Sequence, residues 1–204
     1  MGKMQPFSRI LMLVSALIMI ALFFVPIWQI QMWAPQYPEW LSMQIWIDNI
    51  TGDIAIINGL NHYIGMKEIH VVMFPEFEIM PYILGAIVGL GILLAIVGRQ
   101  FGAWTYLTVL VLAGIAGMVD FYLWSYDYGH NLDPTAAIKV PGMSYQPPLI
   151  GSKELLNFLA FSAPDIGGWL AVVAGALAIG AVVLEVRKNI KNKSINRNPM
   201  ITSN

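Results

Sequence analysis

The sequence predicts an all-α membrane protein: a four-transmembrane-helix bundle with two long, partly structured extracytoplasmic loops. Three observations lead to this fold class. The chain of 204 residues is 57% hydrophobic and only 11% charged, whereas soluble domains contain roughly 25% charged residues. Four apolar runs are long enough to cross a bilayer, which takes about 20 residues. Finally, the basic residues gather in the segments on one side of these runs.

The first apolar run is expected to be a retained membrane helix like the other three. It is too long for the apolar core of a signal peptide, and no small-residue cleavage site follows it. Trp28, Trp33 and Trp40 near its far end are typical of an interfacial aromatic belt. In chain order, the four runs cover residues 10–32, 79–98, 104–126 and 166–186.

The positions of lysine and arginine predict the orientation, because cytoplasmic segments of membrane proteins carry an excess of both. Lys3 and Arg9 precede the first run, and Arg99 lies in the short turn between the second and the third. A basic tail, residues 187–204, follows the fourth run. We therefore expect a multi-pass protein of the bacterial inner (cytoplasmic) membrane with both termini in the cytoplasm and a disordered tail.

Two long loops, residues 34–78 and 127–165, are then left on the outer side of a single membrane domain, residues 1–204. The loops hold all 3 histidines of the chain and most of its carboxylates. Loops of this length are uncommon unless they carry function. The sequence therefore predicts that any site lies in these two loops.

Composition excludes several kinds of chemistry. The chain has no cysteine, which excludes disulfides, thiolate metal sites and iron–sulfur ligation. The motifs of nucleotide-binding loops, zinc proteases and nucleophile elbows are absent from the sequence, as is a pair of intramembrane histidines suited to haem. The net charge of -1 argues against nucleic acid as a partner. We expect neither an enzyme nor a nucleic-acid-binding protein.

Histidine and methionine in the two loops suggest a metal site. Asn58-Gly59 is a turn signal, and in a helix after it His62 and Met66 would lie one turn apart on one face. Imidazole and thioether groups together suit Cu(I). The alternative is that the methionines only pack and that His62 donates to a backbone carbonyl. The predicted metal ligands are His62, Met66, Met73, His130 and Met143.

Asp120 lies inside the third apolar run, where a carboxylate is costly and suggests a functional role. Asp120, Trp124 and Asp127 follow one another at helical spacing, in the direction of His130. We expect Asp120 and Asp127 to act as relay or second-shell groups for the metal site. The alternative is a structural hydrogen bond near the membrane interface.

Five stretches carry a family resemblance that covers most of the chain, both loops included. They are similar to a poorly characterised bacterial multi-pass membrane protein family encoded in nitrous oxide reductase gene clusters, beside a copper chaperone lipoprotein and an ABC exporter. The resemblance implies a role in supporting a periplasmic copper enzyme. It also implies the chaperone, the exporter or the reductase as partners, in addition to the lipid bilayer. The stretches are residues 33–38, 57–66, 73–78, 127–134 and 139–148.

The function expected from these observations is that of an accessory membrane protein in denitrification. It would hold Cu(I) at its outer face and support copper delivery to, or maturation of, periplasmic nitrous oxide reductase. Two alternatives remain open. One is a non-catalytic scaffold or electron-transfer partner that docks a complex through aromatic residues such as Trp33 and Trp40. The other is a small ion or metal permease that uses Asp120.

Overall fold

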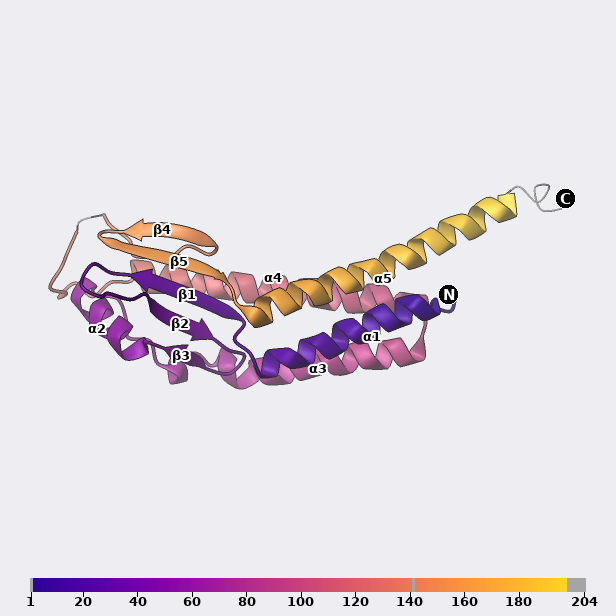
Figure 1. Ribbon diagram of the computed structural model, residues 1–204, viewed down its shortest axis with the longest axis horizontal. Coiled ribbons are helices and arrows are strands. Elements are labelled where there is room, and N and C mark those ends of the chain that lie inside the picture. The colour runs from indigo at the N-terminus through magenta and orange to yellow at the C-terminus, as the bar shows by residue number, and fades with distance from the viewer. Residues whose placement is uncertain (1, 141, 198–204) are drawn as a thin grey trace. The chain divides into compact units, whose positions relative to one another are not determined.

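The structure is a computed structural model that describes residues 2–140 and 142–197 (Figure 1). It is mixed α/β, so the predicted all-α bundle is wrong: the predicted loops, together with the end of the first apolar run, contribute strands to a five-stranded antiparallel sheet. The chain divides into two compact units. They are the helical unit, residues 1–20, 84–112 and 171–204, and the sheet unit, residues 21–83 and 113–170.

Four helices are long and apolar enough to cross a membrane, in the places where the apolar runs predicted them. The first predicted run, 10–32, differs because its helical part ends at Phe23 and its last residues form a strand. The tail predicted to be disordered is helical as far as Arg197, and residues 198–204 lie outside the described residues. The helices are α1 (Pro6–Ile20) with the 3-10 turn η1 (Ala21–Phe23), α3 (Glu76–Val97), α4 (Gln100–His130) and α5 (Ile166–Arg197).

Close contacts around Gly91 join the four helices of the helical unit. A Cβ atom at Gly91 of α3 would lie 2.6 Å from the Tyr106 ring of α4 and 2.8 Å from Ala16 of α1. Small residues at such points let membrane helices approach one another. The Ser15 hydroxyl of α1 lies 3.3 Å from the Tyr106 hydroxyl and donates to the Ala174 carbonyl of α5 at 2.7 Å.

Arg9 caps the end of α3 inside the helical unit. Its Nε donates to the Ala95 carbonyl at 2.8 Å and its Nη2 donates to the Ile96 carbonyl at 2.9 Å. These last carbonyls of a helix lack partners within the helix and carry partial negative charge. The helix stops at Gly98, whose φ of +64° suits glycine, and the Gly98 carbonyl accepts from the Met4 N–H at 2.8 Å. The chain before α1 is thereby fixed to the turn between α3 and α4.

Glu185 of α5 is a carboxylate buried in the helical unit, with 1% of its surface exposed. One carboxylate oxygen accepts from the backbone N–H of Gln5 at 2.7 Å, and the other accepts from Gln100 Nε2 at 3.0 Å. Gln100 Nε2 also lies 3.1 Å from Asn189 Oδ1. Glu185 is therefore the acceptor that ties the start of the chain and the start of α4 to α5.

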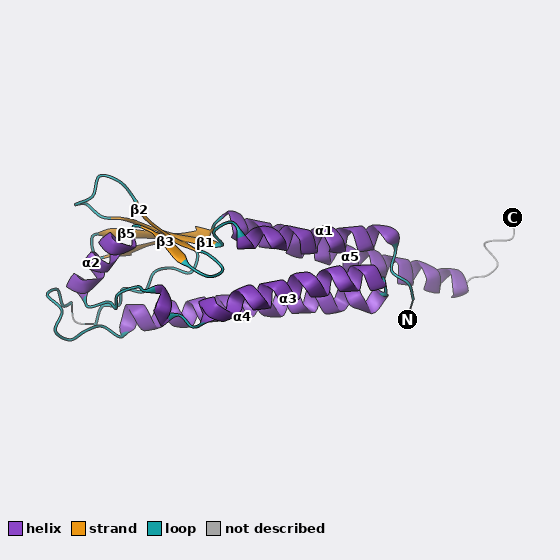
Figure 2. Cartoon of the chain, turned by 90° about the horizontal axis from the view of Figure 1, so that it is seen from below, coloured by secondary structure: helices purple, strands orange, loops and turns teal. Residues whose placement is uncertain are grey.

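The sheet unit contains five strands in the order β3–β2–β1–β5–β4, all antiparallel to their neighbours. Figure 2 shows them as a single layer. The central strand β1 pairs with β2, which follows it closely in sequence, and with β5, which comes after α4. The strands are β1 (Trp28–Trp33), β2 (Leu41–Ile45), β3 (Ile50–Gly52), β4 (Gly151–Leu155) and β5 (Phe158–Pro164).

The core of the sheet unit lies on one face of this sheet. Apolar and polar residues alternate along β1, so that Ile30 and Met32 point to one face while Gln29 and Gln31 point to the other. The apolar face packs against the helix α2 (Ile54–Ile64) and against Tyr128 near the end of α4. We refer to this face as the inner face of the sheet.

Candidate functional site

The inner face of the sheet, α2 and the last turns of α4 enclose a cavity of about 60 Å³. A water molecule takes roughly 30 Å³ in the liquid, so the space suits one ion or one or two waters. The lining side chains come from four strands of the sheet, from α2 and α4, and from the segments that follow these two helices. The lining residues include Met32 and Met43 from the sheet, Asn61 from α2, Met66 after α2, Trp124, Ser125 and Tyr128 from α4, and Tyr145.

The position of Met66 is set by the way α2 ends. The helix stops at Gly65, whose φ of +78° is the left-handed conformation that glycine adopts readily. The Met66 N–H closes the turn by donating to the Asn61 carbonyl at 2.9 Å. Met66 therefore lies beyond the helix and lines the cavity, while His62 is exposed on α2. The expectation that His62 and Met66 share one helical face is wrong, and Asn58-Gly59 lies inside α2 instead of at a turn.

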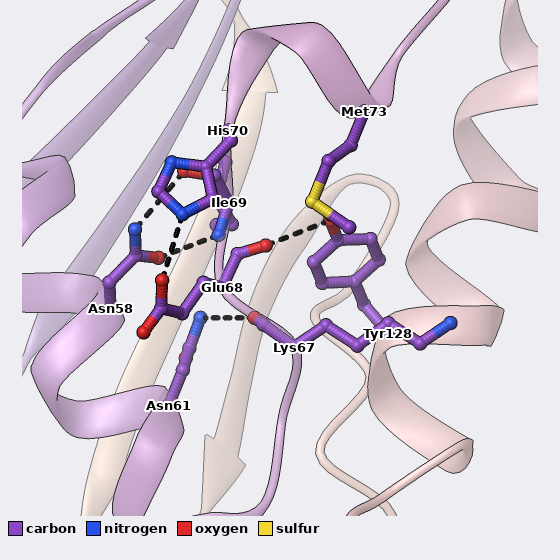
Figure 3. Close-up of polar contacts among 8 residues, drawn as sticks. All are labelled: Asn58, Asn61, Lys67, Glu68, Ile69, His70, Met73 and Tyr128. Atoms are coloured by element: carbon purple, nitrogen blue, oxygen red, sulfur yellow. Dashed lines mark hydrogen bonds and ion pairs between the residues drawn. The ribbon is translucent and has the colours of Figure 1, made fainter.

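Two asparagines of α2 hold the segment that follows it, residues 66–70 (Figure 3). The Asn58 side chain makes two hydrogen bonds to Ile69: its Oδ1 accepts from the Ile69 N–H at 2.7 Å, and its Nδ2 donates to the Ile69 carbonyl at 3.1 Å. Asn61 Nδ2 donates to the Lys67 carbonyl at 3.3 Å. These bonds supply partners for backbone groups of a segment that pairs with no strand, including both groups of the buried Ile69.

Tyr128 of α4 holds the same segment from its other side. Its hydroxyl lies 3.2 Å from the Glu68 carbonyl and 3.9 Å from Met73 Sδ (Figure 3). Met73 ends the 3-10 turn η2 (Val71–Met73) and is half exposed. Next to these residues, the exposed side chains of His70 and Glu68 lie 2.8 Å apart. Met66 and Met73, two of the predicted ligands, are thus both positioned around Tyr128.

Three polar groups in the cavity wall lack a hydrogen-bond partner within the described chain. They are the indole Nε1 of Trp124 and the hydroxyls of Ser125 and Tyr145; the two hydroxyl residues are 1% and 2% exposed. A buried polar group left without a partner costs about 1–3 kcal/mol. Native structures rarely accept this cost unless a water or a ligand supplies the missing bond. The cavity is therefore the place in the sheet unit where a bound species would be stabilised.

The predicted ligands from the second loop lie at the surface or near it. His130 is exposed at the end of α4, where its ring stacks on Tyr126 at 3.9 Å between centroids and its Nδ1 lies 3.0 Å from the Tyr126 carbonyl. Met143 is partly buried, and its N–H donates to the Val140 carbonyl at 3.1 Å. Among the residues that the structure describes, no hydrogen bond or ring contact joins His130 or Met143 to His62.

The two predicted loops nevertheless meet at the end of α2. The Asp133 N–H donates to the Gly65 carbonyl at 2.8 Å, and the Ile138 N–H donates to the Tyr63 carbonyl at 2.9 Å. Hydrogen bonds from the Thr135 hydroxyl and N–H, with smaller contributions from His62 and Lys139, hold the pKa of the exposed Asp133 carboxyl below its usual value. His62 therefore lies beside the segment that connects His130 to Met143.

The two carboxylates predicted as relay groups have different surroundings. Asp127 forms an ion pair with Lys67 at 2.5 Å and accepts a hydrogen bond from Asn131. Asp120 is exposed on α4, about 30 Å along the helix from Arg99 at 1.5 Å per residue. This length equals the thickness of the hydrocarbon core, so if α4 crossed a bilayer from Arg99, Asp120 would lie near the far edge of the core and away from its middle.

Sequence reasoning missed several residues that the structure places in important positions. Met32 and Met43 line the cavity, but in sequence they look like ordinary apolar residues. Tyr145 lies in the second predicted loop, where no metal-ligating pattern singled it out. Glu185 is buried, and no pattern in the sequence singled it out. Alternating residues at the end of the first run were the signal that could have revealed the strand carrying Met32.

Replacing Asn58 with alanine should destabilise the sheet unit by about 1–3 kcal/mol, because two backbone groups of the buried Ile69 lose their partners. The free energy of unfolding, measured with denaturant in detergent micelles, tests this. His62→Ala is the matched control, since His62 is exposed on the same helix. We expect the control to change stability by less than about 0.5 kcal/mol. Equal stability of the two variants would contradict the role given to Asn58.

Comparison of the chain with protein-family models finds no match, and comparison with curated proteins finds no match either.

Proposed function

We propose that the chain is a non-enzymatic accessory protein of the bacterial inner membrane that holds Cu(I) at its outer face and supports copper delivery to periplasmic nitrous oxide reductase. Four helices long and apolar enough to cross a membrane support the location. The family resemblance of both loop segments supports the link to the reductase. The donor groups of the sheet unit support the choice of metal, because imidazole and thioether ligands favour Cu(I).

The main support for the proposal is that the two loop segments contact each other at the end of α2. Backbone bonds join Gly65 to Asp133 and Tyr63 to Ile138. All 3 histidines of the chain and the predicted methionine ligands belong to the sheet unit that these bonds hold together. Soft donor groups from distant parts of the sequence are therefore gathered in one folded unit.

The orientation rests on the basic residues. Lys3 pairs with Arg99 through an isolated β-bridge, and Lys188 Nζ donates to the Lys3 carbonyl at 2.8 Å. One end of the helical unit thus collects basic residues from three separate segments of the chain. The positive-inside rule assigns this end to the cytoplasm, and our proposal accordingly assigns the sheet unit to the periplasmic side.

A second function, a non-catalytic scaffold, is favoured by exposed aromatic residues on the sheet unit. Trp33 and Trp40 are 40% and 47% exposed. Tryptophan is enriched among the residues that dominate protein–protein binding. A scaffold would bind its partner protein without needing a metal, which separates it from the copper proposal.

Metal binding by the intact chain tests the copper proposal. We expect protein purified without oxygen, in detergent, to take up Cu(I) near stoichiometrically in competition with a chromophoric chelator. Zn²⁺ should bind more weakly, because its usual ligands do not include the thioethers that make up most of the predicted set. Protein that stays free of metal but still co-purifies with the reductase would favour the scaffold.

Two results would contradict the proposal as a whole. One is failure of the folded chain to bind Cu(I) under any of these conditions. The other is a cytosolic location for a reporter inserted after Lys139, which lies in an exposed part of the sheet unit. The second result would place the candidate ligands on the wrong side of the membrane for a periplasmic enzyme.

A further inference from the structure

The cavity in the sheet unit has a wall of unusual chemistry. Three of its lining side chains are the thioethers of Met32, Met43 and Met66, and among the described residues that line it none is a carboxylate or a histidine. Hard cations such as Mg²⁺ and Ca²⁺ need several oxygen ligands. Thioethers instead select soft ions such as Cu(I). The rest of the wall is mostly apolar, so a cation held here would depend on the thioethers and would be a soft ion of low charge.

Strand register places two of these methionines side by side. Met43 of β2 lies opposite Ile30 of β1, and Met32 is two residues further along β1 on the same face. Diagonal neighbours of this kind have Cβ atoms about 7–8 Å apart, within reach of long side chains. Methionine has a flexible side chain that adapts to irregular spaces. Both thioethers can therefore reach one point above the inner face of the sheet.

Met66 approaches the cavity from a different direction. It follows the Gly65 cap of α2, and the bonds of Asn58 and Asn61 to the next residues fix the chain there. Sheet and helix end thus present thioethers to the same enclosed space. A set of ligands that converges from separate elements is what a coordination site needs, because its geometry is then held by the fold.

We propose that this cavity binds one soft monovalent cation, Cu(I) or its analogue Ag(I), through the thioethers of Met32, Met43 and Met66. The inference deepens the proposed function and rests on its choice of metal, but it assigns the metal to a buried site instead of the exposed histidines. A volume of about 60 Å³ accommodates one ion with a bound water.

Other groups in the wall complete the environment of the ion. The hydroxyls of Ser125 and Tyr145, which lack partners within the described chain, can offer their oxygen atoms to the cation or to a water bound to it. Trp124 also lines the cavity, and an indole ring attracts a cation to its face. A monovalent ion suits this wall because neutral ligands can surround a single charge more readily than a double one.

Silver binding to matched variants tests the inference, because Ag(I) does not change its oxidation state during the measurement. Titration calorimetry should give one Ag(I) per wild-type chain. The Met32→Leu, Met43→Leu, Met66→Leu triple variant should lose this binding, whereas leucine preserves the packing. Met12→Leu, Met19→Leu is the control, since these methionines are buried outside the cavity. Tyr145→Phe should weaken binding by at least about tenfold.

X-ray absorption of the wild-type chain loaded with Cu(I) provides a second measurement that needs no variant. We expect sulfur atoms in the first coordination shell. A shell of nitrogen atoms, or loss of binding in the His62→Ala, His130→Ala variant with the methionine triple variant unaffected, would overturn the cavity site and leave the proposed function standing. Absence of binding in the wild-type chain would overturn both.

Discussion

Replacing Gly129 with alanine is expected to destabilise the sheet unit by about 3 kcal/mol, the upper end of the usual cost of overpacking. Gly129 lies near the end of α4, and a Cβ atom there would lie 2.3 Å from the backbone nitrogen of Gln146 and 2.4 Å from its Cα. Since both are backbone atoms, no side-chain rotation relieves the clash. The displaced segment includes Tyr145, whose N–H donates to the Gly129 carbonyl at 2.9 Å.

Gly117→Ala provides the matched control because it makes the same change in the same helix at a position with no atom within 4 Å. Alanine is favoured over glycine in a helix by about 1 kcal/mol, so this variant should be as stable as the wild type or slightly more stable. Unfolding by denaturant in detergent measures both. Similar stabilities for the two variants would show that α4 does not pack against the 145–146 segment as described.

Glu185→Ala is expected to cost up to about 3 kcal/mol in the helical unit, because two partly buried donors lose the buried carboxylate as their hydrogen-bond acceptor. The Gln5 N–H loses its acceptor, and Gln100 Nε2 retains only its contact with Asn189. Thermal unfolding of the purified protein in detergent measures the loss.

Glu185→Gln tests whether the acceptor itself is what matters at this position. Glutamine keeps one side-chain oxygen for the Gln5 N–H, so it should recover at least half of the stability lost in Glu185→Ala. Glu154→Ala serves as a surface control, since Glu154 is exposed on β4 and should change stability by less than about 0.5 kcal/mol. A destabilisation in Glu154→Ala equal to that in Glu185→Ala would contradict the assignment.

The four long apolar helices could be predicted from the sequence because their signal is local. An apolar run of sufficient length needs no knowledge of distant residues, and runs 79–98, 104–126 and 166–186 coincide closely with α3, α4 and α5. Helix ends were less predictable. Polar residues after Glu185 suggested a disordered tail, whereas the helix continues to Arg197.

The sheet could not be predicted in the same way. Along Trp28–Trp33 the pattern alternates, with Gln29 and Gln31 between apolar residues, which is typical of a strand with one buried face. This signal was hidden because the strand directly continues an apolar run long enough for a helix. The pairing of β1 with β5 joins residues more than a hundred positions apart, and local patterns carry no information about such partners.

The candidate site was only partly predictable for related reasons. The segments that carry His62 and His130 were both singled out from the sequence, and in the structure the Asp133 N–H donates to the Gly65 carbonyl between them. The four-residue spacing of His62 and Met66 was misleading, because it places the two side chains on one face only in a continuous helix. The helix α2 ends at Gly65, before Met66. Met32, Met43 and Tyr145 become candidate site residues only in the folded structure, where all three line the same cavity.

The position of β1 in the sheet has a consequence for how the protein is made. Its first neighbour, β2, leaves the ribosome soon after it, but its second neighbour, β5, is synthesised only after α3 and α4. Until then β1 keeps an open row of backbone donors and acceptors, the kind of edge that recruits foreign strands. During synthesis the nascent chain thus passes through a state in which β1 is paired on one side only. A chain truncated anywhere before Phe158 would remain in that state.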